Sequence, residues 1–253
     1  MGKNKLKKFA EMETLKCVYQ YPYNVLKEHV ECPLRGRWGE DVFHNSNPIV
    51  LELGCGKGEY AVGLGRLYPD KNFIGIDIKG ARMWTGAKEV EEAGMENVAF
   101  LRTSIHLLAS FFAPGEVSEI WITFPDPQMK KVNKRLTGTH FLDIYRQVLA
   151  PDGVIHLKTD SPFLYTYTTE MLRHNGIVPI AATDDIYGTE YSRIVPPIKT
   201  FYEQQWLARG IPSKYISWRL PEGITLTEPE VEIEPDTYRS FGRGVLQSGE
   251  LEL

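Results

Sequence analysis

The sequence has no long apolar run and few cysteines. No stretch of its 253 residues approaches the roughly 18–20 consecutive apolar residues that a membrane helix needs, so we expect no membrane partner. The basic residues 1–8 are not followed by an apolar segment, which argues against a secretory signal. Cys17, Cys32 and Cys55 show no metal-ligand spacing and cannot all pair with one another. We therefore expect reduced thiols, no metal and a cytoplasmic protein.

A surplus of positive charge is also missing. The formal net charge of −4 argues mildly against non-specific nucleic-acid binding, which usually shows as a basic excess. This net charge is compatible with a local basic patch on an otherwise acidic protein. The composition, 42% hydrophobic and 25% charged, is that of a globular chain. Its length suffices for one large domain with a buried core.

From Pro48 onward, short apolar runs alternate with amphipathic stretches. This alternation predicts a doubly wound α/β fold, with a mostly parallel sheet and crossover helices in a single domain. The expected strands are Ile49–Leu53, Asn72–Asp77, Val98–Leu101, Glu119–Phe124 and Val154–Lys158, with possible further strands at Ile177–Ala181 and Tyr215–Leu220. The expected helices are Gly58–Tyr68, Ala81–Ala93, Ile105–Phe112, Phe141–Leu149 and Phe163–His174.

The same change of pattern sets the expected organisation of the chain. An N-terminal extension covers residues 1–47, the α/β domain covers residues 48–220, and an acidic C-terminal tail covers residues 221–253. The tail is either an edge strand or a loosely held segment. There is no internal repeat and no low-complexity tract.

A glycine-rich turn follows the first predicted strand of the domain. Gly54, Gly56 and Gly58 are spaced Gly-x-Gly-x-Gly, unlike the Gly-x-Gly-x-x-Gly of dinucleotide-binding folds. Glu52 lies two positions before the first glycine, where a carboxylate would repel phosphates but suits a cationic ammonium group. Asp77 closes the next strand, about 20 residues after the turn, where a carboxylate accepts hydrogen bonds from ribose hydroxyls. Alone, either acid could be an ion-paired strand end; together with the glycines they favour a nucleoside cofactor.

This pattern resembles that of class I S-adenosylmethionine-dependent methyltransferases. The resemblance implies a Rossmann-like fold and S-adenosylmethionine as cofactor. It implies that the cofactor is bound by Glu52, the three glycines and Asp77. A further contact to the adenine is usual after the third strand, where the family generally has Asp or Asn. Residues 101–104 read Leu-Arg-Thr-Ser here, so Ser104 is the candidate.

The end of the fourth predicted strand carries a second motif, in which Pro125 and Pro127 flank Asp126 and a basic run follows. Ligands of open α/β sheets collect at the carboxyl ends of strands, so Asp126 should face the reacting group. In isolation, Pro-Asp-Pro is a stiff turn and the basic run a solvated surface. Residues 124–135 are nevertheless similar to the Phe-Pro-Asp-Pro-Trp-x-Lys-Lys…Lys-Arg signature of bacterial tRNA (guanine-N7)-methyltransferases, with Gln128 in place of the usual Trp.

Two further segments match the same family. Residues 156–160 end the fifth strand at Asp160, and residues 199–203 resemble its Thr-x-x-Glu element. In isolation, Thr200 and Glu203 also look like a helix capping box. The resemblance assigns Asp126 to catalysis and cofactor binding, and it assigns four residues to the substrate: Lys130, Asp160, Thr200 and Glu203. It also implies that Lys131, Lys134 and Arg135 meet phosphates.

The resemblance therefore implies an enzyme that methylates N7 of guanine 46 in the variable loop of tRNA, as a monomer or homodimer. Guanine N7 carries a lone pair and no proton, so the reaction needs positioning rather than a general base. Three alternatives stay open on the residues alone. They are a class I methyltransferase acting on a protein or small molecule, an NAD(P)-linked oxidoreductase, and a non-catalytic tRNA-binding subunit.

Overall fold

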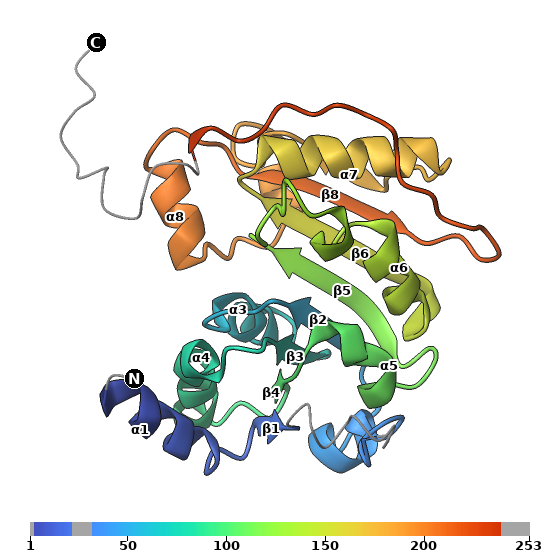
Figure 1. The fold of residues 1–253 in the computed structure, drawn as a ribbon. Helices are drawn as coiled ribbons and strands as arrows, with labels where there is room; N and C mark the ends of the chain where they lie inside the picture. Colours follow the sequence, from blue (N-terminus) through green and yellow to red (C-terminus); the bar gives the residue numbers. More distant parts are fainter. Residues whose placement is uncertain (1–2, 22–31, 239–253) are drawn as a thin grey trace.

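The computed structural model describes residues 3–21 and 32–238. Its strands form one sheet in the order β1-β4-β3-β2-β5-β6-β8-β7 (Figure 1). From β1 to β6 all neighbours are parallel, and β8 runs antiparallel to both β6 and β7. The strands are β1 (Val18–Gln20), β2 (Ile49–Leu53), β3 (Asn72–Ile76), β4 (Val98–Arg102), β5 (Val117–Thr123), β6 (Leu149–Thr159), β7 (Ala181–Thr183) and β8 (Lys214–Arg219).

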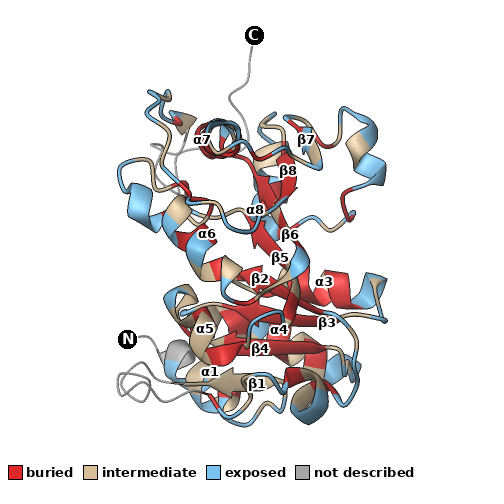
Figure 2. Cartoon of the chain, turned by 90° about the vertical axis from the view of Figure 1, so that its right-hand side faces the viewer, coloured by how far each residue is buried: buried red, intermediate tan, exposed pale blue. Residues whose placement is uncertain are grey.

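Helices cover both faces of this sheet. They are α1 (Lys3–Met12), α3 (Glu59–Leu67), α4 (Gly80–Ala93), α5 (Leu108–Phe111), α6 (Thr139–Arg146), α7 (Pro162–His174) and α8 (Phe201–Leu207). Because strand side chains alternate between faces, β2 sends Leu51 and Leu53 into one core with α5, α6 and α7, and Val50 into a second core with α3 and α4. Figure 2 shows the strands between these layers as largely buried. The predicted doubly wound, mostly parallel sheet is confirmed.

Predicted and observed elements differ mainly near the carboxyl-terminal half. The strand expected at Ile177–Ala181 is wrong except for its last residue, where β7 begins. Ile177 alone packs into the core, while Val178 and Ile180 are exposed. Strand β6 begins five residues earlier than expected, at Leu149, where the helix expected to reach that residue has already ended. The edge strand considered for the tail is absent from residues 221–238.

The described parts of residues 1–47 are built into the same body. Strand β1 pairs with β4 at the sheet edge. Helix α1 packs on α4, where the indole N–H of Trp84 donates to Glu11 at 2.7 Å. Trp38, in a π-helical turn (Trp38–Phe43), is 0% exposed and donates to the carbonyl of Phe111 at 2.8 Å. The domain boundaries at residues 47 and 220 stay a prediction.

The sequence predicted no membrane helix and reduced cysteines. Within residues 3–21 and 32–238, no helix is long and apolar enough to cross a bilayer. Cys17, Cys32 and Cys55 all lie in the described part of the chain, and all three are free thiols.

Candidate active site at the carboxyl ends of the strands

A cleft of about 840 Å³ opens at the carboxyl ends of the central strands. Gly54, Asp77 and Asp160 directly follow β2, β3 and β6, and all three line it, together with Asp126 from the loop after β5. The chain leaves β2 toward one face of the sheet and β5 toward the other, so the cleft lies at the topological switch point where open α/β sheets bind ligands. Helix α8, Arg209 and Tyr238 line the opposite wall.

The glycine turn forms open floor for a ligand. Gly54 and Gly56 have left-handed backbones with φ of 73° and 56°, which side chains rarely tolerate. A Cβ on Gly54 would meet nothing within 4 Å, and one on Gly56 only the Gly54 carbonyl at 3.9 Å. Gly58 has a different role, because its Cβ would lie 2.5 Å from the Phe100 ring. The first two glycines thus leave room for a ligand, and the third lets α3 pack on β4.

Asp77 braces this turn. Its carboxylate accepts hydrogen bonds from the backbone N–H of Gly56 at 3.0 Å and of Lys79 at 2.8 Å. It is half-buried and still faces the cleft. A carboxylate held in this way keeps acceptor capacity in a fixed direction, as binding of vicinal hydroxyls requires.

Glu52, in contrast, does not line the cleft. It is 3% exposed, and its carboxylate accepts from the Ala61 N–H at 2.9 Å and from the Thr123 hydroxyl at 2.7 Å. It therefore joins α3 to β5 beneath the glycine turn. Burial raises the pKa of Glu52 to about 7, against the opposing effect of these two hydrogen bonds.

This raised pKa predicts a pH-dependent stability. Between about 4.5 and about 7 the folded chain retains on Glu52 a proton that the unfolded chain releases. The contribution is fully present below the unfolded pKa and is lost as pH rises through the folded pKa, by up to about 1.4 kcal/mol per pH unit. Glu52→Gln should remove that slope. Urea unfolding at pH 5 and at pH 7.5 measures it; an equal stability change in both proteins would contradict the assignment.

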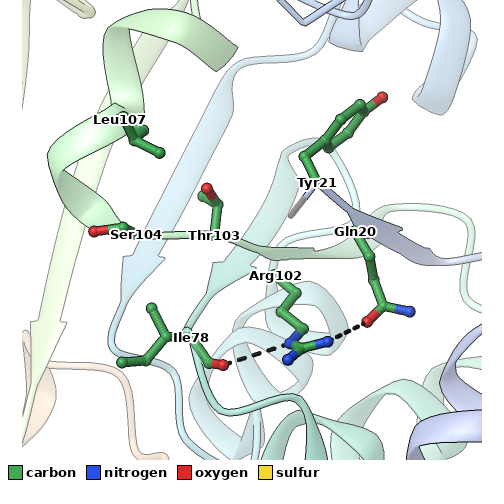
Figure 3. A pocket seen from close by; sticks show the side chains of 7 residues that line it. All are labelled: Gln20, Tyr21, Ile78, Arg102, Thr103, Ser104 and Leu107. Carbon is green, nitrogen blue, oxygen red and sulfur yellow. Dashed lines mark hydrogen bonds between the residues drawn. The ribbon is translucent and has the colours of Figure 1, made fainter. Parts of the chain in front are cut away.

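A second cavity of about 320 Å³ adjoins the cleft. Ile78 lines this cavity, and the preceding residue, Asp77, lines the cleft. Figure 3 shows Ile78 and Leu107 on either side of the segment Thr103–Ser104. Ile78 is 61% exposed although it is apolar. Apolar flanks with a polar edge suit a flat heterocycle, and the predicted residue Ser104 lies at that edge.

The loop after β5 has a strained backbone. Phe124 and Gln128 both adopt left-handed conformations, with φ of 47° and 48°, although neither is glycine. Asp126 lies between them, exposed, and accepts a hydrogen bond from the Gln128 N–H at 3.0 Å. Such conformations persist where the surroundings enforce them, and they cluster at functional sites.

Arg135 supplies part of that enforcement, which corrects its expected role. Its guanidinium donates to the carbonyls of Met129 at 2.7 Å and Gln128 at 3.2 Å, and it is only 6% exposed. It therefore holds the strained loop from beneath and does not present its charge to a phosphate. The lysines behave as expected of a basic surface: Lys130, Lys131 and Lys134 are exposed, and Lys134 lines the cleft.

Thr200 and Glu203, which were predicted to bind substrate, do not line the cleft and make their contacts inside the fold. Thr200 caps α8 by accepting the Glu203 N–H at 3.2 Å. The Glu203 carboxylate is 0% exposed and pairs with the buried Lys158 at 2.8 Å, while the Tyr187 hydroxyl donates to it at 2.7 Å. Burial lowers the pKa of Lys158, and Glu203 opposes that shift.

The α8 residues that do line the cleft were missed. They are Phe201, Tyr202, Gln205 and Trp206; Arg209, just after the end of the helix at Leu207, lines the cleft as well. Phe201 and Tyr202 are 45% and 41% exposed. The available signal was this pair of aromatic residues inside a capping box, because exposed aromatics beside a cleft are suited to stacking.

Comparisons with known sequences agree with the motifs. The model of a family described as a putative methyltransferase matches residues 46–214. The chain is 62% identical to the tRNA (guanine-N(7)-)-methyltransferase of Porphyromonas gingivalis, over 92% of this chain and 96% of the relative. It is 57% identical to that of Bacteroides thetaiotaomicron over 96% of both chains. It is 38% identical to that of Geobacillus thermodenitrificans over 70% of this chain and 81% of the relative.

Solved structures agree on the fold. The 16S rRNA methyltransferase KamB matches with a TM-score of 0.54 at 13% identity, over 71% of this chain and 90% of that one. A 30S ribosomal A1408 methyltransferase from an uncultured bacterium matches with a TM-score of 0.52 at 12% identity, over the same shares. The Rossmann-like fold of class I methyltransferases is thereby confirmed.

Proposed function

The chain belongs to the tRNA (guanine-N(7)-)-methyltransferase family, and from this premise we propose that it transfers a methyl group from S-adenosylmethionine to N7 of a guanine in tRNA. The guanine is position 46 of the variable loop, and the enzyme works in the cytoplasm as a monomer or homodimer. The observation that carries the proposal is the convergence of Gly54, Asp77, Asp126 and Asp160 on one cleft.

The open floor and the second cavity fit the cofactor. Gly54 and Gly56 leave space for its amino-acid part, Asp77 accepts from its ribose hydroxyls, and the edge at Ser104 meets the adenine between apolar flanks. When bound, S-adenosylmethionine supplies an electrophilic methyl group. Glu52 contributes from beneath by fixing the start of α3 against β5.

Asp126 is proposed as the catalytic residue. Methylation makes the purine cationic, so a carboxylate already fixed beside the reacting atoms stabilises charge that develops in the transition state. The strained loop and Arg135 hold Asp126 in place before substrate arrives, which lowers the reorganisation needed during the reaction. Asp160, at the end of β6, is proposed to act on the hydrogen-bond donor edge of the guanine.

The tRNA backbone meets the exposed lysines at positions 130, 131 and 134 beside the cleft. Thr200 and Glu203 support substrate binding indirectly, because they fix the α8 residues that line the opposite wall. Aromatic side chains there offer stacking surface to an unstacked base.

The decisive experiment is mass analysis of tRNA after incubation with the enzyme and S-adenosylmethionine. We expect 7-methylguanosine at position 46. No methylated nucleoside, or methylation of protein alone, would overturn the proposal. Isothermal titration with S-adenosylhomocysteine and with NAD separates the oxidoreductase alternative, since only the former should bind.

Replacing Asp77 with Ala should weaken cofactor binding. The variant loses a charged acceptor for the ribose and the brace on the Gly56 N–H, a loss of roughly 1–3 kcal/mol. Titration with S-adenosylhomocysteine measures the change. Asp70→Ala is the matched control, because Asp70 is exposed and lies outside the cleft. Unchanged affinity in a folded Asp77→Ala protein would remove Asp77 from the cofactor site.

Replacing Lys130, Lys131 and Lys134 with Ala should weaken tRNA binding and flatten its salt dependence. Each lost phosphate contact should reduce the slope of log affinity against log salt by about 1. Cofactor affinity should stay unchanged. Lys88→Ala on the outer side of α4, where Lys88 pairs with Glu92, serves as control. An unaltered salt slope in the triple variant would show that these lysines only solvate the surface.

A further inference from the structure

Helix α4 carries its charges in the reverse of the order that stabilises a helix. Lys79 directly precedes the helix and Arg82 lies in its first turn, whereas Glu91 and Glu92 lie in its last turn. The macrodipole makes the amino end of a helix positive, so cations at that end and carboxylates at the other both oppose helix stability. A charge pattern that works against the fold is expected where the charges serve a function instead.

Both cations lie at the cleft. Lys79 and Arg82 line it; Lys79 is exposed and Arg82 is half-buried. Within residues 3–21 and 32–238, neither side chain forms an ion pair or a hydrogen bond with another residue. Their charges therefore face the solvent of the cleft without a counter-charge from the protein. This is the state in which a cation can exchange its counterions for a phosphate.

Arg82 also lies close to the glycine turn and to α8. Gly86 follows it by one helical turn on the same face of α4, and a Cβ there would lie 2.6 Å from the Lys57 carbonyl, so α4 packs closely on the glycine turn. The Lys57 ammonium in turn lies 4.0 Å from the centre of the Phe201 ring on α8. Cations and exposed aromatic rings thus lie together on this side of the cleft, as on surfaces that bind single-stranded nucleic acid.

These cations lie on the other side of the glycine floor from the lysines at positions 130, 131 and 134. Lys79 and Arg82 come after β3, whereas those three lysines come after β5, and β2 lies between the two strands in the sheet (Figure 1). Strands two positions apart are separated by about 10 Å. The open glycine floor that follows β2 therefore has positive charge on both sides.

We propose that Lys79 and Arg82 form a second binding surface for the tRNA backbone, which binds phosphates on the α4 side of the target guanosine. The inference deepens the proposed function and rests on it. An enzyme that draws a base out of its stack loses stacking energy, and backbone contacts on both sides of that nucleotide offset the loss. The reversed charge of α4 is then explained, because the anion that compensates Lys79 and Arg82 is the substrate.

The test measures dissociation constants of an unmodified tRNA transcript at a series of salt concentrations, with the enzyme saturated with S-adenosylhomocysteine. Lys79→Ala/Arg82→Ala should reduce the slope of log affinity against log salt by about 1.5–2, the value for two phosphate contacts. At about 0.1 M salt this is a loss of tRNA affinity of roughly 30- to 100-fold. The affinity for S-adenosylhomocysteine alone, measured by titration, should stay unchanged.

Arg66→Ala/Lys88→Ala is the matched control. It also removes one arginine and one lysine, so the net charge changes by the same amount. These two cations pair with Glu89 at 2.7 Å and Glu92 at 3.5 Å, and they do not line the cleft. The salt slope of this control should equal that of the wild type. An equal fall of the slope in both double variants would be a general effect of net charge and overturns the inference.

Combining Lys79→Ala/Arg82→Ala with the replacement of lysines 130, 131 and 134 shows whether the two surfaces bind different phosphates. The two reductions in salt slope should add, because each surface loses its own contacts. If the combined variant has the same slope as the lysine variant alone, both sets of cations act on the same phosphates and the inference is overturned.

The melting temperature gives an independent readout. Removing cations from the positive end of α4 should leave it unchanged or raise it. An unchanged salt slope with a lower melting temperature would make Lys79 and Arg82 residues that serve the fold, and overturns the inference. A loss of affinity for S-adenosylhomocysteine as large as the loss for tRNA also overturns it. Failure of the wild-type enzyme to form 7-methylguanosine is a different result, which overturns the proposed function itself.

Discussion

Asp126→Asn should slow methyl transfer by about 100-fold or more, the scale of losing a preorganised electrostatic contact. The fold should survive, because the amide oxygen of Asn can still accept the Gln128 N–H that shapes the loop. Most cofactor affinity should survive too, since the glycine floor and Asp77 are untouched. The variant loses the negative charge that stabilises the purine cation as the methyl group is transferred.

Single-turnover transfer with saturating tRNA and cofactor is the appropriate measurement, because it excludes binding and product release. Asp152→Asn, at an exposed carboxylate far from the cleft in the β6 extension, is a suitable control. A wild-type rate in Asp126→Asn would reduce Asp126 to a turn residue. A rate defect in Asp160→Asn instead would exchange the roles of the two aspartates.

The sheet could be predicted where local pattern and burial coincide. Strand β2 was predicted with its observed bounds, because a short apolar run ends there at a glycine. In the structure all five residues of the strand are buried, and Gly54 adopts the left-handed conformation of a tight turn. The convergence of Gly54, Asp77 and Asp160 followed from the parallel arrangement alone, since the carboxyl ends of parallel strands meet at one edge. Strand β1 was not predicted, because its three half-buried residues carry no periodicity and pair only with distant β4.

The side of the site built by non-local contacts could not be predicted. Thr200 and Glu203 fit a capping box and a substrate motif equally well in sequence, and the buried contact of Glu203 with Lys158 is visible only in the structure. Tyr238 reaches Asp160 across 78 positions of sequence. Arg135 looks like part of a basic run until its carbonyl partners are known. In each case the role depends on a contacting residue that the local sequence pattern does not predict.

The Lys158–Glu203 pair should be the most sensitive point of the α8 wall. Both side chains are 0% exposed, with 2.8 Å between the ammonium nitrogen and a carboxylate oxygen. Lys158→Met removes the positive charge and leaves the buried Glu203 carboxylate with the Tyr187 hydroxyl but without a counter-charge. Breaking a buried ion pair in this way lowers the free energy of unfolding by about 3–5 kcal/mol. The Lys158 ammonium also donates to the Ile198 carbonyl at 2.9 Å, so the segment leading into α8 loses a contact as well.

Urea unfolding of the wild type, both single variants and the double variant Lys158→Met/Glu203→Leu tests this. The double variant should be more stable than Lys158→Met, because it replaces a pair by apolar side chains and leaves no isolated charge. Lys88→Met breaks the exposed pair with Glu92 on α4 and should cost at most about 1 kcal/mol. If Lys158→Met lowers the free energy of unfolding by no more than that control, the buried pair does not hold α8.

The double variant should still bind S-adenosylhomocysteine, whose proposed contacts lie on the strand ends. Because its α8 is fixed by packing alone, its affinity for tRNA should fall by more than its affinity for the cofactor.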